Sequence, residues 1–318
     1  MHVLITGGCG YVGTMLTQEL LKQGYRVTVV DRMWFGNWLP EHPRLKVVQE
    51  DVRVAEKVDM KGVDAVIHLA NVANDPCGEL DSKLVWEVNV LATMLLVEQA
   101  LRHGVRQFIY ASSGSVYGVR EESEVTEDVP LVPISDYNKT KMVSERVLLS
   151  YKDQILIQCV RPGTVCGYSP RMRLDLSVNM LTMQALTGGV ITVLGGDQTR
   201  PNIHIHDIVG VYLHLLELKE KAAGIYNAGF ENPSILDIAR RITEYVPAEI
   251  KISGSNDPRS YRLNSGKLLS TGFQPRCGVQ EGIEEVIEAF RSGKLRDEDR
   301  YYNIRMMKKL PGYSEKTS

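Results

Sequence analysis

A tyrosine and a lysine with helical spacing are the residues in this sequence best suited to acid–base chemistry. Tyr137 and Lys141 are four positions apart, so on a helix their side chains lie on one face. The spacing alone decides little, because about one such pair is expected by chance in a chain with 14 tyrosines. However, Ser112, Ser113 and Ser115 follow a predicted strand, at the sheet edge where open α/β folds bind ligands. A hydroxyl from this turn can therefore face the phenol.

A glycine-rich turn near the start of the chain predicts a dinucleotide site. Residues 6–13 read Thr-Gly-Gly-Cys-Gly-Tyr-Val-Gly between a predicted strand and a predicted helix. Gly10 lets the backbone approach a pyrophosphate, and Gly13 lets the helix pack closely on the strand. Asp31 ends the next predicted strand, where a carboxylate accepts hydrogen bonds from the adenosine ribose and repels the 2′-phosphate of NADP. Arg32 could tolerate that phosphate, but the carboxylate is the more restrictive group, so the sequence favours NAD.

Short apolar runs alternate with amphipathic segments through the first half of the chain, which predicts a doubly wound parallel sheet with helices on both faces. We expect helices from Val12 to about Leu20, over 80–102 and over 136–149. The expected strands are 3–6, 26–30, 46–49, 65–69, 107–111 and 155–160.

The rhythm changes after Pro162, where glycine, proline and arginine cluster and the apolar runs become short. This predicts a Rossmann-type domain over 1–162, joined by some later segments, and a smaller substrate-binding α/β lobe, with the C-terminal tail, mainly over 163–318. Helices are expected there at 174–186, 207–218, 234–245 and 279–290. No structure is predicted for 294–318.

Composition excludes several classes of protein. Of 318 residues, 43% are hydrophobic and 24% charged, and 37 basic against 39 acidic residues give a net charge of −2, so we expect neither nucleic acid nor an anionic membrane as a partner. No apolar run approaches a membrane span, and no targeting segment is recognised. The five cysteines are odd in number and widely spaced, which predicts a reducing cytoplasm. His204 and His206 lack a third ligand at a sensible spacing, so no metal is predicted.

Taken together, these motifs resemble the extended short-chain dehydrogenase/reductase family, and within it the NAD-dependent nucleotide-sugar epimerase/dehydratase group related to UDP-galactose 4-epimerase. The resemblance covers nearly the whole chain. It depends on residues 6–13, 51–52, 68–70, 89–90, 112–118, 137–141, 161–165 and 200–207.

The resemblance implies a catalytic set of Ser113, Tyr137 and Lys141. Tyr137 would take a proton from a sugar hydroxyl as hydride leaves the same carbon for NAD, while Ser113 hydrogen-bonds the developing carbonyl oxygen. A free tyrosine has a pKa of about 10, so ionisation near neutral pH needs a shift of roughly 3 units. Lys141 and the positive nicotinamide ring would supply that shift.

The resemblance also implies which residues hold the two ligands. The cofactor-binding residues are expected at Gly7, Gly10, Tyr11, Val12, Gly13, Asp31, Arg32, Asp51, Val52, Leu69, Ala70, Asn71, Asn89, Ser112, Tyr137, Lys141 and Pro162. The substrate-binding residues are expected at Asn74, Ser113, Ser115, Asn179, Arg200 and Arg259, with the two arginines as diphosphate clamps. Arg171, Arg173 and Arg262 are weaker candidates, because arginines in loops are usually solvated.

The residues that follow the catalytic serine narrow the reaction. Related 4,6-dehydratases carry acidic residues where this chain has Gly114 and Ser115, so water elimination and decarboxylation are disfavoured. We expect an NAD-dependent epimerase of a nucleotide-diphosphate sugar, acting at C4 through a 4-keto intermediate. The alternative is a net C4 dehydrogenase or 4-ketoreductase with the same machinery. A non-catalytic NAD-sensing module is remote, because all three catalytic groups are present. The two long helices resemble those of the family's dimer interface, which predicts a homodimer.

Overall fold

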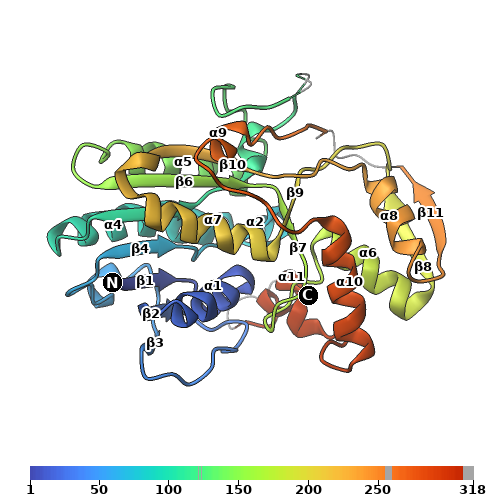
Figure 1. The fold of residues 1–318 in the computed structure, drawn as a ribbon, viewed down its shortest axis with the longest axis horizontal. Helices are drawn as coiled ribbons and strands as arrows, with labels where there is room; N and C mark the ends of the chain where they lie inside the picture. The colour runs from blue at the N-terminus through green and yellow to red at the C-terminus, as the bar shows by residue number, and fades with distance from the viewer. Residues whose placement is uncertain (121, 123, 255–259, 311–318) are drawn as a thin grey trace.

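A seven-stranded parallel sheet forms the centre of the fold (Figure 1). The computed structural model describes all residues except 121, 123, 255–259 and 311–318. The strand order is β10-β6-β5-β4-β1-β2-β3. From β1, the chain first adds strands on one side, β2 and β3, and then on the other side, beginning with β4, which confirms the predicted doubly wound fold. The strands are β1 (His2–Thr6), β2 (Arg26–Asp31), β3 (Leu45–Gln49), β4 (Ala65–His68), β5 (Gln107–Ala111), β6 (Leu156–Pro162) and β10 (Gly224–Ala228).

The apolar strands are covered on both faces because their side chains alternate between two cores. In β1, Val3 and Ile5 belong to one hydrophobic cluster, whereas Leu4 belongs to the other. All three are fully buried. This explains why the strand reads as a continuous apolar run rather than an alternating one.

Helices form the two outer layers. α1 (Tyr11–Lys22) and α7 (Ile205–Leu218) contribute to one cluster, and α4 (Ala92–Arg102) and α5 (Asp136–Leu149) contribute to the other. The prediction that 207–218 lies in the smaller lobe is wrong, because α7 packs against α1 and its apolar residues join the core of the sheet. β10 likewise returns to the sheet and pairs with β6.

The helix predicted over 80–102 is divided. α2 (Asp75–Leu80) ends at Asp81, whose extended backbone and side-chain cap of Leu84 start α3 (Ser82–Trp86). A π-helical turn, η2 (Glu87–Leu91), then connects α3 to α4. Contrary to expectation, this 82–102 segment is long and apolar enough to cross a membrane, with a mean hydropathy of 1.4. Half of that window is buried in the protein, and core helices pass the same test.

The smaller lobe lies at one end of the molecule, on the right in Figure 1. It contains α6 (Ser177–Gly188), α8 (Ile235–Thr243), α10 (Val279–Arg291) and the parallel pair β8 (Val190–Leu194) and β11 (Glu249–Ser253). These helices begin and end within a few residues of the predicted ranges.

Several short elements complete the chain. β7 (Thr164–Cys166) and β9 (Asn202–His204) form a second parallel pair. The remaining elements are α9 (Gly266–Leu269), α11 (Asn303–Met307) and the 3-10 turns η1 (Ala55–Lys57), η3 (Gly114–Tyr117), η4 (Lys219–Ala222) and η5 (Asp299–Tyr301). The segment 299–307, for which no structure was predicted, is therefore ordered, and Met307 packs into the core of the sheet.

Candidate active site

A cavity of about 530 Å³ opens where the carboxyl ends of the central strands meet the smaller lobe. The glycine turn, the serines after β5, Tyr137 and Lys141 all line it. The structure therefore brings together the two motifs on which the sequence interpretation depends, although more than 120 residues separate them in the chain.

The glycine turn is closed by contacts that leave no space for side chains. Gly7 has a φ of +74°, and a Cβ on it would lie 2.6 Å from the Ala70 nitrogen. A Cβ on Gly13 would lie 2.3 Å from the Gly7 carbonyl oxygen. Gly10 precedes the first residue of α1 and provides no side-chain cap, so the first amides of the helix remain available to an anion.

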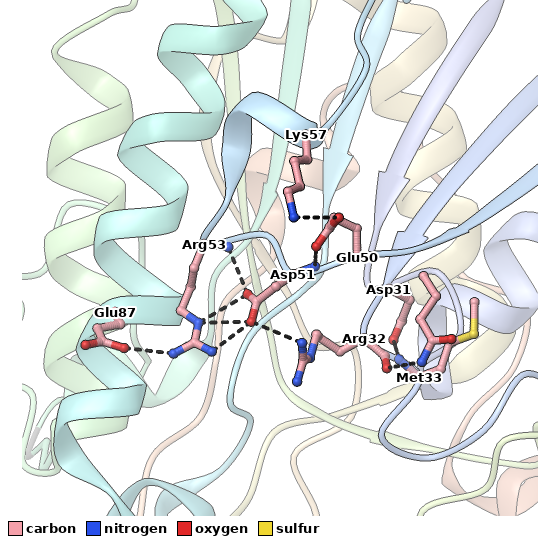
Figure 2. A network of polar contacts seen from close by, with 9 residues as sticks. Asp31, Arg32, Met33, Glu50, Asp51, Arg53, Lys57 and Glu87 are labelled. Carbon is pink, nitrogen blue, oxygen red and sulfur yellow. Dashed lines mark hydrogen bonds and ion pairs between the residues drawn. The ribbon is translucent and has the colours of Figure 1, made fainter.

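Asp31, the predicted partner of the ribose, ends β2 beside the glycine turn. Its carboxylate accepts hydrogen bonds from the Cys9 and Met33 amides, at 3.0 and 2.7 Å, and burial raises its pKa. Figure 2 shows Arg32 turned instead towards Asp51, with 3.7 Å between its Nη1 and the Oδ2 of Asp51. Both residues line the cavity.

Asp51 and its neighbours form a charged network at the same edge (Figure 2). Arg53 lies between two carboxylates and donates to Asp51 through Nε and Nη2 and to Glu87 through Nη1. Burial opposes ionisation of Asp51, but the hydrogen bonds and charge of Arg53 outweigh burial and lower the pKa. Asp51 and Val52, which is also buried, both line the cavity.

The catalytic candidates meet in one corner of the cavity. Burial raises the pKa of Tyr137 to about 12, although a hydrogen bond with Ser113 opposes this shift. Lys141 donates from Nζ to the Ala111 carbonyl at 2.6 Å and lies 5.8 Å from the centre of the Tyr137 ring. Burial lowers the pKa of Lys141 to about 7, opposed by the charge of Glu145. The charge of Arg173 also opposes the effect of burial on the pKa of Tyr137, but burial outweighs it.

A buried ion pair between Glu145 and Arg161 lies next to the catalytic candidates. Glu145, one helical turn after Lys141, accepts from Arg161 through Nε and Nη2 at 2.9 and 2.6 Å. The Ser112 hydroxyl donates to the same carboxylate. Ser112 lines the cavity as predicted, but its hydroxyl is used in this network. Arg161 Nη1 completes the network with a hydrogen bond to Tyr117.

The remaining serines belong to a separate chain of hydroxyl contacts. The Oγ atoms of Ser113 and Ser115 are 2.7 Å apart, and Ser115 donates to Asn138 at 2.6 Å. Ser115 thereby helps to orient the Ser113 hydroxyl. Both serines line the cavity.

Two predicted ligand-binding residues do not reach the cavity. The Asn89 amide bonds the backbone of Val72 and the Thr140 hydroxyl, so it joins two helices to the loop after β4. The Asn179 amide accepts from the Gly167 nitrogen and donates to the Tyr11 hydroxyl. Both side chains are buried, and their hydrogen bonds hold together segments that line the cavity. Arg259 lies outside the described residues.

The other predicted residues line the cavity. Those predicted to bind the cofactor are Gly7, Gly10, Tyr11, Val12, Gly13, Asp31, Arg32, Asp51, Val52, Leu69, Ala70, Asn71, Ser112, Tyr137, Lys141 and Pro162, and those predicted to bind the substrate are Asn74, Ser113, Ser115 and Arg200. Arg262, a weaker candidate, is exposed and does not line it.

Sequence reasoning underestimated the loop after β7. Arg171 and Arg173, predicted to be solvated loop residues, both line the cavity, and Arg171 is buried whereas the Arg173 side chain is 12% exposed. Arg173 makes a two-point ion pair with Asp175, with both N–O distances at 3.0 Å, and Asn74 donates to the same carboxylate at 3.1 Å. The sequence pattern Arg-x-Arg-x-Asp over 171–175 was the signal that could have indicated paired arginines in this loop.

Aromatic and C-terminal residues were missed altogether. Trp34, Phe35, Tyr212, Tyr261 and Asn303 line the cavity, but no local pattern marks them. Each comes from a loop or helix that only the tertiary fold brings to the site.

The histidine pair is engaged by a carboxylate. Nε2 of His204 and of His206 lie 3.2 and 3.4 Å from the two oxygens of Glu285 on α10. Among the residues that the structure describes, no group of three or more His, Cys, Asp or Glu side chains is arranged to hold a metal ion.

Comparisons with known proteins agree with this geometry. Residues 3–229 match the sequence profile described as the NAD dependent epimerase/dehydratase family. The chain is 31% identical to a probable UDP-arabinose 4-epimerase of Arabidopsis thaliana, over 80% of this chain and 69% of that protein. It is 28% identical to MoeE5 in complex with UDP-glucuronic acid and NAD, with a TM-score of 0.83 over 92% of this chain and all of that one. It is 26% identical to the UDP-glucose 4-epimerase of Thermus thermophilus in complex with NAD, with a TM-score of 0.80 over 92% and 99% of the two chains. With its glycine turn, Asp31 and Tyr-x-x-x-Lys pair in one cavity, this chain belongs to the NAD-dependent epimerase/dehydratase family, as a nucleotide-sugar enzyme of the extended short-chain dehydrogenase/reductase type.

Proposed function

We propose that this protein inverts C4 of a nucleotide-diphosphate sugar through a 4-keto intermediate. The observation that carries the proposal is the meeting of Ser113, Tyr137 and Lys141 in the cavity that also contains the glycine turn. Two of the relatives described above are named 4-epimerases, which supports the position on the sugar ring.

Each catalytic side chain has a separate task. Tyr137 takes the proton from the C4 hydroxyl. It returns this proton after the hydrogen bonded to C4 has moved to the opposite face of the sugar ring. Ser113, which lines the same cavity, donates a hydrogen bond to the carbonyl oxygen as it forms. Lys141, whose pKa burial lowers to about 7, supplies a positive charge near the phenol when it is protonated.

Bound NAD would supply the hydride acceptor and, in its oxidised form, a second positive charge beside the phenol. The residues fit this group, because the turn at 7–13 leaves helix amides open to phosphate and Asp31 has backbone partners that keep its oxygens facing the cavity. Burial raises the pKa of Tyr137 to about 12, and that second charge would favour its ionisation.

The positions after Ser113 favour redox chemistry at one carbon over water elimination. Gly114 has no side chain, and the Ser115 hydroxyl donates to Asn138. No carboxylate therefore follows the catalytic serine to move protons at C5 and C6. The second candidate, a net C4 dehydrogenase or 4-ketoreductase, uses the same three residues and differs only in whether the ketone leaves.

The test is incubation of the purified protein with UDP-, GDP-, CDP- and dTDP-sugars without added NAD, followed by NMR and mass spectrometry. An inverted C4 at constant mass supports the epimerase, whereas a loss of two hydrogens that requires added NAD supports the dehydrogenase. Tyr137→Phe should abolish turnover while the variant still binds NADH. Normal turnover by this variant would contradict the whole assignment.

We also propose a homodimer that buries the 82–102 helix. Trp86 and Leu91 are large apolar residues on this segment, 37% and 47% exposed, which supports a covered face there. Light scattering should give twice the chain mass at micromolar concentration, and a monomer would contradict the proposal.

We propose a cytoplasmic location, supported by five unpaired cysteines, four of them buried. Fractionation of cells that express the full chain checks the location, and recovery of the protein with membranes would contradict it.

A further inference from the structure

Arg171 is a buried cation that faces the cavity with an incomplete set of partners. It is 2% exposed. Its Nη1 donates to the Met172 carbonyl and its Nη2 to the Asn303 side chain, whereas Nε has no hydrogen-bond partner in the described part of the chain. No ion pair with a carboxylate is formed by this guanidinium among the described residues. A buried charge of this kind is costly unless an anion approaches it.

The loop that carries Arg171 is fastened to the glycine turn. Ser169 donates from Oγ to the Tyr11 carbonyl at 2.9 Å, and the Tyr11 hydroxyl donates to the Gly167 carbonyl at 2.6 Å. Tyr11 is the first residue of α1, whose amino end is the phosphate site. Arg171 therefore comes from a loop held beside that phosphate site.

The surroundings of Arg171 belong to the adenosine half of the cofactor site. Its guanidinium stacks on Phe35, 4.1 Å from the ring centre, in the loop between β2 and β3. The charges of Asp175 and of Asp31 both act on Arg171, so the guanidinium lies between the two carboxylates. Arg173, in contrast, is paired with Asp175 and lies near Tyr137 on the sugar side.

Three distant parts of the chain meet at Arg171. The Phe35 ring stacks on the guanidinium, and the Asn303 side chain on α11 accepts a hydrogen bond from Nη2 of Arg171. Asn303 is 5% exposed, and its neighbour Ile304 also lines the cavity. The C-terminal segment 299–307 thus orients a guanidinium that lines the cavity and whose Nε has no partner among the described residues.

We propose that Arg171 binds the pyrophosphate of NAD opposite the glycine turn, and that Asn303 positions it, so that the segment 299–307 fastens the cofactor in its site. A guanidinium suits this role because its fork of donors matches phosphate oxygens. The proposal depends on NAD binding alone and stands whether or not the enzyme inverts C4.

The experiment measures ligand affinity of cofactor-free protein by NADH fluorescence, with ADP, AMP and UDP as competitors. Arg171→Met should weaken NADH and ADP by about 10- to 100-fold and AMP by much less, because a charge-assisted contact to the second phosphate is lost. Asn303→Leu should weaken NADH and ADP by about 10-fold, with the guanidinium still present but misplaced.

Arg305→Ala is the matched control, because Arg305 lies on the same short helix, is half exposed and pairs with Asp299. It should bind ADP within about twofold of the wild type. Arg171→Lys should restore part of the ADP affinity. If Arg171→Met does not fold, Asn303→Leu and Arg171→Lys decide the question with the same ligands.

Three results would count against the proposal, and the first two would overturn it. The first is unchanged ADP affinity in both Arg171→Met and Asn303→Leu. The second is a loss confined to UDP, which would assign Arg171 to the diphosphate of the substrate. Loss of turnover with normal ADP affinity would also count against it, whereas failure of the C4 chemistry with the expected ADP losses would leave it intact.

Discussion

The buried ammonium of Lys141 should destabilise the cofactor-free protein, so that Lys141→Met makes the protein more stable as well as inactive. Lys141 is 1% exposed, and burial lowers its pKa from 10.5 to about 7. Below the folded-state pKa the charged amine carries the full desolvation cost, and this cost disappears as the pH rises through the unfolded-state value.

The size of the effect follows from the two pKa values. The difference between 10.5 and about 7 corresponds to a cost of about 4 kcal/mol at pH 7, which falls to about 2 kcal/mol at pH 9. Methionine also removes the hydrogen bond from Nζ to the Ala111 carbonyl, worth about 1 kcal/mol. We therefore expect Lys141→Met to raise the free energy of unfolding by about 3 kcal/mol at pH 7 and about 1 kcal/mol at pH 9.

The assay is urea unfolding of cofactor-free wild type and variant at both pH values and one protein concentration. Lys139→Met is the control on the same helix, because Lys139 is exposed and makes only a 3.5 Å ion pair with Asp136. It should change stability by less than about 0.5 kcal/mol. A Lys141→Met variant that is less stable than wild type by the same amount at both pH values would refute the reasoning.

Three further predictions concern the supports of the site. Gly13→Ala places a Cβ 2.3 Å from the Gly7 carbonyl oxygen, so we expect the turn to open and gel filtration to separate the protein from NAD. Glu145→Gln leaves the Arg161 guanidinium buried without its counter-ion. We expect it to lower the free energy of unfolding, measured in urea, by about 3 to 5 kcal/mol. A loss below about 1 kcal/mol would show that the ion pair is dispensable. Asp31→Ser removes the carboxylate that repels a 2′-phosphate, so competition between NADPH and NADH should shift by about tenfold or more towards NADPH, and an unchanged preference would exclude Asp31 as the selector.

The sequence predicted those parts of the molecule that local patterns determine. The apolar strands and α5 were found within one or two residues, because a strand buried on both faces leaves a compact apolar run and a helix leaves a 3.6-residue period. The glycine turn and the Tyr137–Lys141 pair were found for the same reason, since each is a short motif with a fixed geometry.

Features that depend on contacts between distant segments were not predictable in this way. Whether Asn89 faces a ligand or a neighbouring helix depends on where Thr140 and Val72 lie. Arg171 reads as a solvated loop residue until Asn303, 132 positions later in the chain, is placed beside it. The helix at 205–218 has the same periodicity in either lobe, so only its packing against α1 identifies its layer.

The return of β10 to the edge of the sheet means that the catalytic half of this enzyme is not a contiguous module. A fragment that stops at Pro162 would lack β10, which pairs with β6. It would also lack α7, which covers apolar side chains in the core of the sheet. Such a piece would expose the edge of β6 and the apolar face that α7 covers. Transplanting sugar specificity from a relative therefore means splicing at several crossings between the lobes, never exchanging one uninterrupted half of the polypeptide for another.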